Sequence, residues 1–180
     1  MTLSADEFGR QALEQLDALA RVAAGLTNNR AEADDLVQET YLRALRAREQ
    51  FEPREHGVRP LLLRIMHNIH ITRVTRAKRQ PVATDPGELE LRNGYAAAFP
   101  PVPPELDDTV RITLAELAPE LRSALTLWAV EELSYKEMAE VLEIPVGTVM
   151  SRLYRARHAL AGKLRERAPE MLSGSAARYG

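Results

Sequence analysis

The 180-residue sequence lacks cysteine, is poor in aromatic residues (5%) and contains no apolar run long enough to cross a membrane. The absence of cysteine excludes disulfides and cysteine-ligated zinc, and it agrees with a reducing, cytoplasmic environment. The low aromatic content argues against an all-β sandwich. The first ten residues, MTLSADEFGR, carry acids and lack the apolar centre of a secretory signal. These absences favour a helical protein of the cytoplasm.

A charge excess of one sign is also absent, because 24 basic and 26 acidic residues give a formal net charge of −2. The charges are nevertheless sorted along the chain. Residues 81–110 contain one basic and six acidic residues, whereas residues 64–79 contain five basic residues and no acidic one. Residues 152–167 contain six basic residues and a single acid, Glu166. Two balanced blocks therefore flank an acidic stretch, and each block ends in a basic segment of helix length.

Proline separates the two blocks, since six of the eleven prolines lie in QPVATDPGELELRNGYAAAFPPVPPELDD. Proline removes a backbone donor and biases the preceding residue away from helix. We expect an all-α protein with two small helical domains, residues 1–79 and 108–167. Residues 80–107 are expected to form a flexible, acidic, proline-rich linker, and residues 168–180 a frayed tail.

Apolar residues recur at helical spacing in the first block, and they predict three helices. The first is expected to run through Phe8 and Ala23 as one helix. The second is expected to open at Asp34 and Asp35, with a buried stripe that includes Leu45. The third is expected over about residues 61–78, with an apolar start and a basic end.

The second block predicts a helix-turn-helix. A helix through Val110 and Leu117 is followed by one that Pro119 opens and whose apolar residues include Trp128. In LSYKEMAEVLEIPVGTVMSRLYRARHAL, Ser134 and Glu137 have the spacing of a capping box. Pro145 then ends that helix, and the next begins at Gly147 and Thr148, so two short helices are joined by a tight turn.

The last of these helices has two distinct faces. Val149, Leu153, Ala156 and Leu160 make one apolar stripe, and Thr148, Ser151, Arg152 and Arg155 gather on another face. Small hydroxyls followed by arginines suit the major groove of DNA, where arginine binds guanine or phosphate. The alternative is an ordinary solvated amphipathic helix.

Two stretches resemble a known family. AEADDLVQETYLRAL and LLLRIMHNIHITRVTR resemble the region-two domain of bacterial sigma factors, and ITLAELAPELRSALTLWAVEELSYKEMAEVLEIPVGTVMSRLYRAR resembles the region-four domain. Their order resembles the extracytoplasmic-function (ECF) group of the sigma-70 family, which has these two domains alone. The resemblance implies a protein without catalytic activity or cofactor that binds core RNA polymerase and promoter DNA, and that an anti-sigma factor often holds inactive.

The resemblance also assigns residues to three surfaces. Core-polymerase binding is implied for Asp34, Asp35, Leu36, Gln38, Glu39 and Thr40. Minus-ten DNA binding is implied for Phe51, Arg54, His56, Arg59, Arg64, Asn68, Arg73, Arg76, Lys78 and Arg79. Minus-thirty-five DNA binding is implied for Ser134, Tyr135, Lys136, Gly147, Thr148, Met150, Ser151, Arg152 and Arg155.

The sequence departs from the family pattern at two places. Pro60 and Leu61 stand where a tryptophan is common, and Met150 stands where the recognition helix often has a lysine. His67 and His70 have the spacing of a metal-binding pair, but no carboxylate or cysteine accompanies them, so we expect no metal.

Other functions remain open. A stand-alone helix-turn-helix regulator with an all-α sensing or dimerisation domain would bind an operator without polymerase, and a sigma-like decoy would bind another regulator without reading DNA. An enzyme is disfavoured because no catalytic triad, phosphate-binding loop or carboxylate pair occurs.

Overall fold

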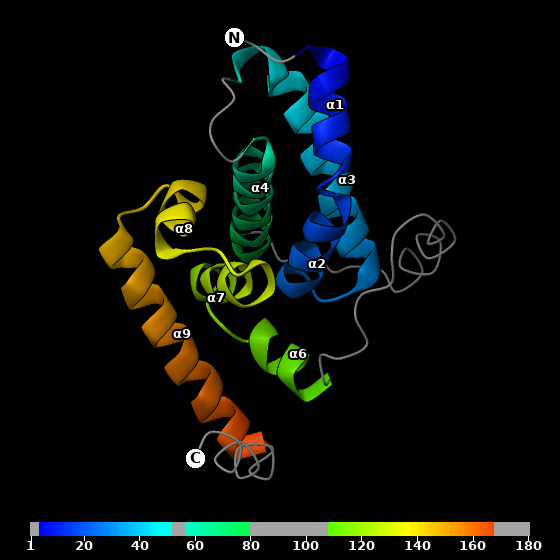
Figure 1. The fold of residues 1–180 in the computed structure, drawn as a ribbon. Coiled ribbons are helices and arrows are strands. Elements are labelled where there is room, and N and C mark those ends of the chain that lie inside the picture. The colour runs from blue at the N-terminus through cyan, green and yellow to red at the C-terminus, as the bar shows by residue number, and fades with distance from the viewer. Residues whose placement is uncertain (1–3, 52–56, 80–107, 168–180) are drawn as a thin grey trace.

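The computed structural model describes residues 4–51, 57–79 and 108–167, and the regular structure of these residues is entirely helical (Figure 1). The all-α prediction is therefore confirmed for this part of the chain. The first half contains α1 (Ala5–Leu13), α2 (Leu16–Leu26), α3 (Arg30–Ala47), the short 3₁₀ helix η1 (Arg48–Gln50) and α4 (Arg59–Arg79). The second half contains α6 (Asp108–Ala115), α7 (Pro119–Glu131), α8 (Tyr135–Leu142) and α9 (Val146–Arg167).

Short polar side chains start two helices of the first half, α1 and α3. The Ser4 hydroxyl accepts a hydrogen bond from the Glu7 amide at 3.2 Å and starts α1. The Asn29 side chain accepts one from the Glu32 amide at 2.9 Å and starts α3.

Three predictions about these helices are wrong. The single N-terminal helix is interrupted at Glu14–Gln15, so that α1 and α2 are separate. The helix predicted to open at Asp34 and Asp35 is α3, and it begins four residues earlier, at Arg30, because the Asn29 side chain caps it there. Leu45, expected in its buried stripe, is exposed.

In the second half, a proline starts α7, a capping box starts α8, and a residue in the left-handed conformation ends each of these two helices. Pro119 occupies the first turn of α7, where its missing amide costs nothing. The predicted capping box is confirmed: the Ser134 amide donates to the Glu137 carboxylate at 2.9 Å, and the Glu137 amide donates to the Ser134 hydroxyl at 3.3 Å. Glu132 and Glu143 end α7 and α8 in the left-handed conformation, with φ of 52° and 54°. Trp128 of α7 lies at the surface under the Arg157 guanidinium.

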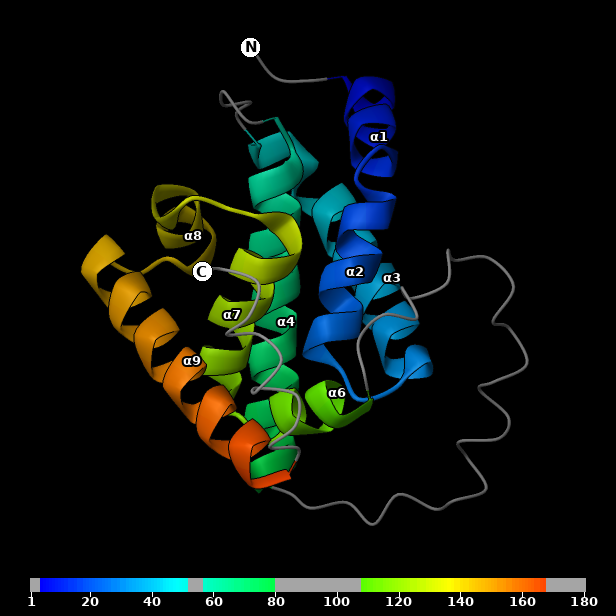
Figure 2. The same cartoon turned by 60° about the horizontal axis from the view of Figure 1, so that its bottom comes forward.

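The two halves pack against each other around one continuous apolar core. Helices α2, α3 and α4 lie together, α2 packs on α7, and α4 packs on both α7 and α8 (Figures 1 and 2). The core accordingly joins Leu26, Leu62 and Met66 of the first half to Leu127 and Met138 of the second. α9 covers the outer side of α7 and α8 and contacts α6 near its end. Among the described residues, no helix combines the length and apolar character needed to cross a membrane.

Candidate nucleic-acid interface

Helices α8 and α9 form the helix-turn-helix, and α9 keeps one side for the core and one for solvent. Val149, Leu153 and Ala156 are buried, whereas Ser151 and Arg155 are exposed. No Asp or Glu occurs between Glu143 and Glu166, so the exposed side carries basic and neutral groups only. A helix face of this composition attracts phosphate and can reach base edges in a major groove.

The remaining minus-thirty-five candidates surround the start of α9. Ser134 and Lys136 are exposed at the start of α8, while Tyr135 is partly buried against the core. Gly147 and Met150 are exposed, whereas Thr148 and Arg152 are half-buried.

The second basic segment is the C-terminal part of α4. Arg73, Arg76, Lys78 and Arg79 are exposed there, and Asn68 is exposed one turn before Thr72. Arg73 makes an ion pair with Glu39 of α3, so its guanidinium also ties α4 to α3. Arg54 and His56 lie outside the residues that the structure describes. The described basic surface therefore follows α4 without the loop that precedes it.

Three other minus-ten candidates already have partners within the protein. Phe51 packs edge-on against Phe8, with ring centroids 5.8 Å apart, and it contributes to the core. Arg59 donates to the Glu131 carboxylate at 2.7 Å, and Arg64 lies 3.6 Å from the Glu143 carboxylate. Both acids belong to the second half of the chain, so these two arginines join the halves in this arrangement.

The polymerase-binding candidates on α3 divide by burial. Leu36 and Thr40 are fully buried, and the Thr40 hydroxyl donates to the Leu36 carbonyl at 2.7 Å, so both side chains lie beneath the surface. Gln38 is exposed and Asp34 and Asp35 are half-buried. These three side chains form a polar and acidic face of α3.

The acids of α3 are held in different electrostatic environments. Partial burial raises the pKa of Asp34, against the opposing effect of Arg30, whose guanidinium is 3.8 Å away. Although partial burial also acts on Glu39, hydrogen bonds from Arg73 and Arg43 keep the pKa of Glu39 below its usual value. Glu39 is therefore paired with Arg43 and Arg73, whereas Gln38 is exposed.

His67 and His70 of α4 are buried between the two halves. Burial lowers the pKa of each imidazole to about 4. At His67 the positive charge of Arg152 lowers the pKa further, whereas the negative charges of Glu120 and Glu143 raise it. At His70 the positive charges of Arg122 and Arg73 lower the pKa further. Nδ1 of His67 and Nε2 of His70 have no hydrogen-bond partner among the described residues. In those residues no group of three or more His, Cys, Asp or Glu side chains is arranged to hold a metal ion.

Arg122 and Glu131 make the main polar contacts between the halves. The buried Arg122 guanidinium donates to the Gly25 carbonyl at 2.7 Å, the Thr27 carbonyl at 2.6 Å and the Asn28 side chain at 3.1 Å. The buried Glu131 carboxylate forms ion pairs with Arg59 and with Arg21 of α2, the latter at 3.1 Å.

The sequence analysis missed both of these residues, because each acts across about 70 to 110 positions of sequence. The available signal was α7 itself, where small or apolar residues occupy nearly the whole circumference and predict burial on more than one side.

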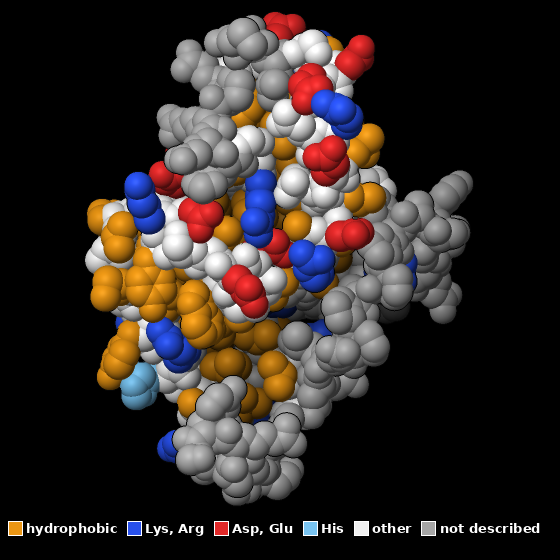
Figure 3. Space-filling model, in the orientation of Figure 1, with side chains coloured by type: hydrophobic (Ala, Val, Ile, Leu, Met, Phe, Trp, Pro, Cys, Tyr) orange, Lys and Arg blue, Asp and Glu red, His pale blue; other side chains and the backbone are white. Residues whose placement is uncertain are grey.

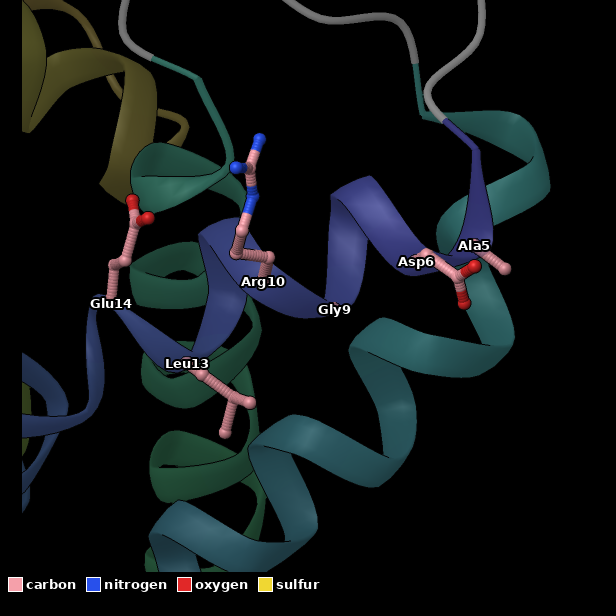
Figure 4. A pocket seen from close by; sticks show the side chains of 6 residues that line it. All are labelled: Ala5, Asp6, Gly9, Arg10, Leu13 and Glu14. Carbon is pink, nitrogen blue, oxygen red and sulfur yellow. The ribbon is translucent and has the colours of Figure 1, made fainter.

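The surface beside α1 offers no comparable site. Among the described residues, those of α1 and its C-cap, from Ala5 to Glu14, line the hollow there, and their side chains diverge (Figure 4). No other element of the described part of the chain contributes to this lining, so these residues do not enclose a ligand.

Comparisons with known proteins identify both halves. A family model described as Sigma-70 region 2 matches residues 13–80, and one described as Sigma-70, region 4 matches residues 110–160. The chain is 37% identical over 147 residues to the ECF RNA polymerase sigma factor SigC of Mycobacterium tuberculosis (strain CDC 1551 / Oshkosh), covering 79% of this chain and 74% of that protein. The chain belongs to the ECF sigma factors.

Two further similarities place this ECF sigma factor among its relatives. It is 31% identical over 171 residues to the ECF RNA polymerase sigma factor SigE of Mycolicibacterium smegmatis, covering 92% of this chain but spanning only 63% of that protein. Its structure resembles that of the sigma factor RpoE from Bartonella quintana, solved in complex with the anti-sigma factor NepR. The TM-score is 0.67 at 25% identity, covering 89% of this chain and 98% of that chain.

Proposed function

We propose that this ECF sigma factor binds core RNA polymerase in the cytoplasm and directs it to promoters, without contributing a catalytic group of its own. The α3 face binds polymerase, the α4 surface binds the minus-ten element, and α9 reads the minus-thirty-five element. The domains that carry these roles are residues 1–79 and 108–167.

The observation that carries this proposal is the exposed face of α9. Ser151 and Arg155 lie on it behind a capped α8 and a short turn, and the nearest acids along the sequence are Glu143, which ends α8, and Glu166, in the last turn of α9. Arginine bonds to guanine edges and to phosphate explain why such a face lacks carboxylates. A solvated helix face has no reason to exclude acids over this length.

Polymerase docking is assigned to Asp34, Asp35 and Gln38. Their side chains reach the surface of α3, whereas Leu36 and Thr40 shape the helix from below. Glu39 supports this face through Arg73 and Arg43. The face is polar and acidic, as suits a basic partner helix.

Promoter binding requires the halves to separate. Arg64 and Glu143 are 3.6 Å apart, so α4 and the turn before α9 are adjacent. The minus-ten and minus-thirty-five elements lie roughly 25 base pairs apart, which is about 85 Å at ~3.4 Å per base pair. The described arrangement is therefore a closed state, and the chain opens before both elements are read.

An anti-sigma factor is the proposed regulator of this chain. The RpoE of Bartonella quintana, which covers most of this fold, was solved with such a partner. A protein that binds both halves at once would favour the closed state by its differential affinity for it.

In vitro transcription tests the function. The full chain with core RNA polymerase is expected to initiate at discrete promoters, and Arg155→Ala is expected to lower initiation by roughly tenfold, as loss of one bidentate base contact does. A gel shift without polymerase is the control. Specific, tight binding of DNA by the chain alone, with no initiation when core is added, would instead support a stand-alone regulator.

A further inference from the structure

An apolar stripe runs along the exposed side of α9, next to Ser151 and Arg155. Val146, Met150 and Tyr154 are four residues apart and are 42%, 53% and 64% exposed. Hydrophobic side chains gather over α9 in Figure 3. The stripe is separate from the core side of the helix, because Val149 and Leu153 occupy that side and are fully buried.

Burial inside the chain does not account for this stripe. Single exposed apolar residues are ordinary on a protein surface, but neighbouring ones on successive helical turns mark a contact surface. Their neighbours on the helix surface are Ser151 and Arg155, and no carboxylate lies nearby on α9. The charge of this surface complements DNA.

The major groove presents one apolar group that such side chains can contact, the C5-methyl of thymine. Met150 is well suited to it, because its unbranched thioether side chain adapts to irregular surfaces. Met150 and Tyr154 are four residues apart, about 6 Å along the helix axis. This distance is close to two base-pair steps of about 3.4 Å, so the two side chains can contact base pairs that lie near each other in the same element.

We infer that Met150, followed by Tyr154, makes this protein select thymine within its minus-thirty-five element through contact with the thymine methyl group. This inference rests on the proposed function, since it assumes that α9 lies in the major groove. The proposed function places Met150 at the DNA interface, and this inference adds that Met150 recognises thymine.

The experiment begins by selecting minus-thirty-five sequences from a randomised promoter library with the full chain bound to core RNA polymerase. Each thymine of the selected element is then replaced by deoxyuridine, which removes the methyl group and changes nothing else in the base pair. The wild-type holoenzyme is expected to lose about fourfold in affinity at one thymine, the value of one buried methyl group.

Two variants give the comparison. With Met150→Ala, the deoxyuridine effect at that thymine is expected to disappear, and with Met150→Lys the library is expected to yield guanine there. Ile112→Ala is the matched control, because Ile112 of α6 is apolar and 52% exposed but lies off α9. That variant is expected to keep the full deoxyuridine effect.

The possible failures are separable. If the holoenzyme selects a minus-thirty-five element but no deoxyuridine substitution weakens binding, the inference about Met150 is wrong while the proposed function stands. The same holds if Met150→Ala retains the fourfold loss. If the holoenzyme selects no element at all, the proposed function itself is wrong, and the inference falls with it.

Discussion

Replacing Arg122 by alanine is expected to release the two halves of the chain from each other. The guanidinium extends from α7 into the end of α2 and donates three hydrogen bonds, two of them to the backbone carbonyls of Gly25 and Thr27. Truncation removes all three bonds and leaves the carbonyls without their donor for as long as the halves stay together.

The magnitude follows from these two carbonyls. A buried acceptor left without a partner costs about 1–3 kcal/mol, so the pair costs about 2–6 kcal/mol. Water that enters the truncated site recovers part of this, and we expect a net loss of about 3 kcal/mol. That loss changes the ratio of closed to open molecules by about 150-fold. The closed-to-open ratio of Arg122→Lys is expected to lie between those of the wild type and Arg122→Ala, because lysine keeps the charge but not the planar arrangement of donors.

Single-molecule fluorescence transfer measures this ratio directly. The chain contains no cysteine, so cysteines placed at the exposed Glu14 and Arg165 can be labelled selectively. Arg155→Ala is the control, since it removes an exposed arginine away from the contact between the halves. Circular dichroism checks that the helices survive. An unchanged transfer efficiency in Arg122→Ala, with helices intact, would refute the argument that this arginine holds the halves together.

Two more predictions concern the same contact. Because the pKa of His67 and His70 is lowered to about 4 in the closed state, the open state binds more protons below the ordinary value of 6.5. The stability of the closed state relative to the open state should therefore be greatest at neutral pH and fall by roughly 2–4 kcal/mol by pH 5. Fluorescence transfer measured as a function of pH checks this. Replacing both histidines by leucine should remove most of this pH dependence. Gly25→Ala places a Cβ 2.5 Å from Cγ2 of the buried Thr126 and should cost about 1–3 kcal/mol in thermal unfolding, whereas Gly9→Ala, with nothing within 4 Å, should not destabilise.

The sequence predicted those features that depend on local chemistry. Ser134 and Glu137 form the capping box as expected, and Pro119 opens its helix, because capping and proline geometry involve residues a few positions apart. The alternation of buried and exposed side chains on α9 also follows from helical periodicity, as Val149 and Ser151 demonstrate.

Features that depend on packing were missed or misplaced. Periodicity identified Trp128 and Leu45 as apolar positions but not which partner covers them, and both are exposed. The break between α1 and α2 has no proline or glycine to signal it. Arg122 and Glu131 read as surface residues because their partners come from the other half of the chain.

Binding of core RNA polymerase tests the central claim most directly. Wild type is compared with Asp35→Arg/Gln38→Arg, which reverses the α3 face but leaves Glu39 and its ion pair with Arg73 in place. The control, Asp17→Arg/Glu14→Gln, changes the formal charge by the same amount at exposed positions elsewhere. The account predicts that wild type and control bind core equally and that the α3 variant binds more weakly by over about tenfold. Equal binding by all three, or no binding by the wild type, would contradict it.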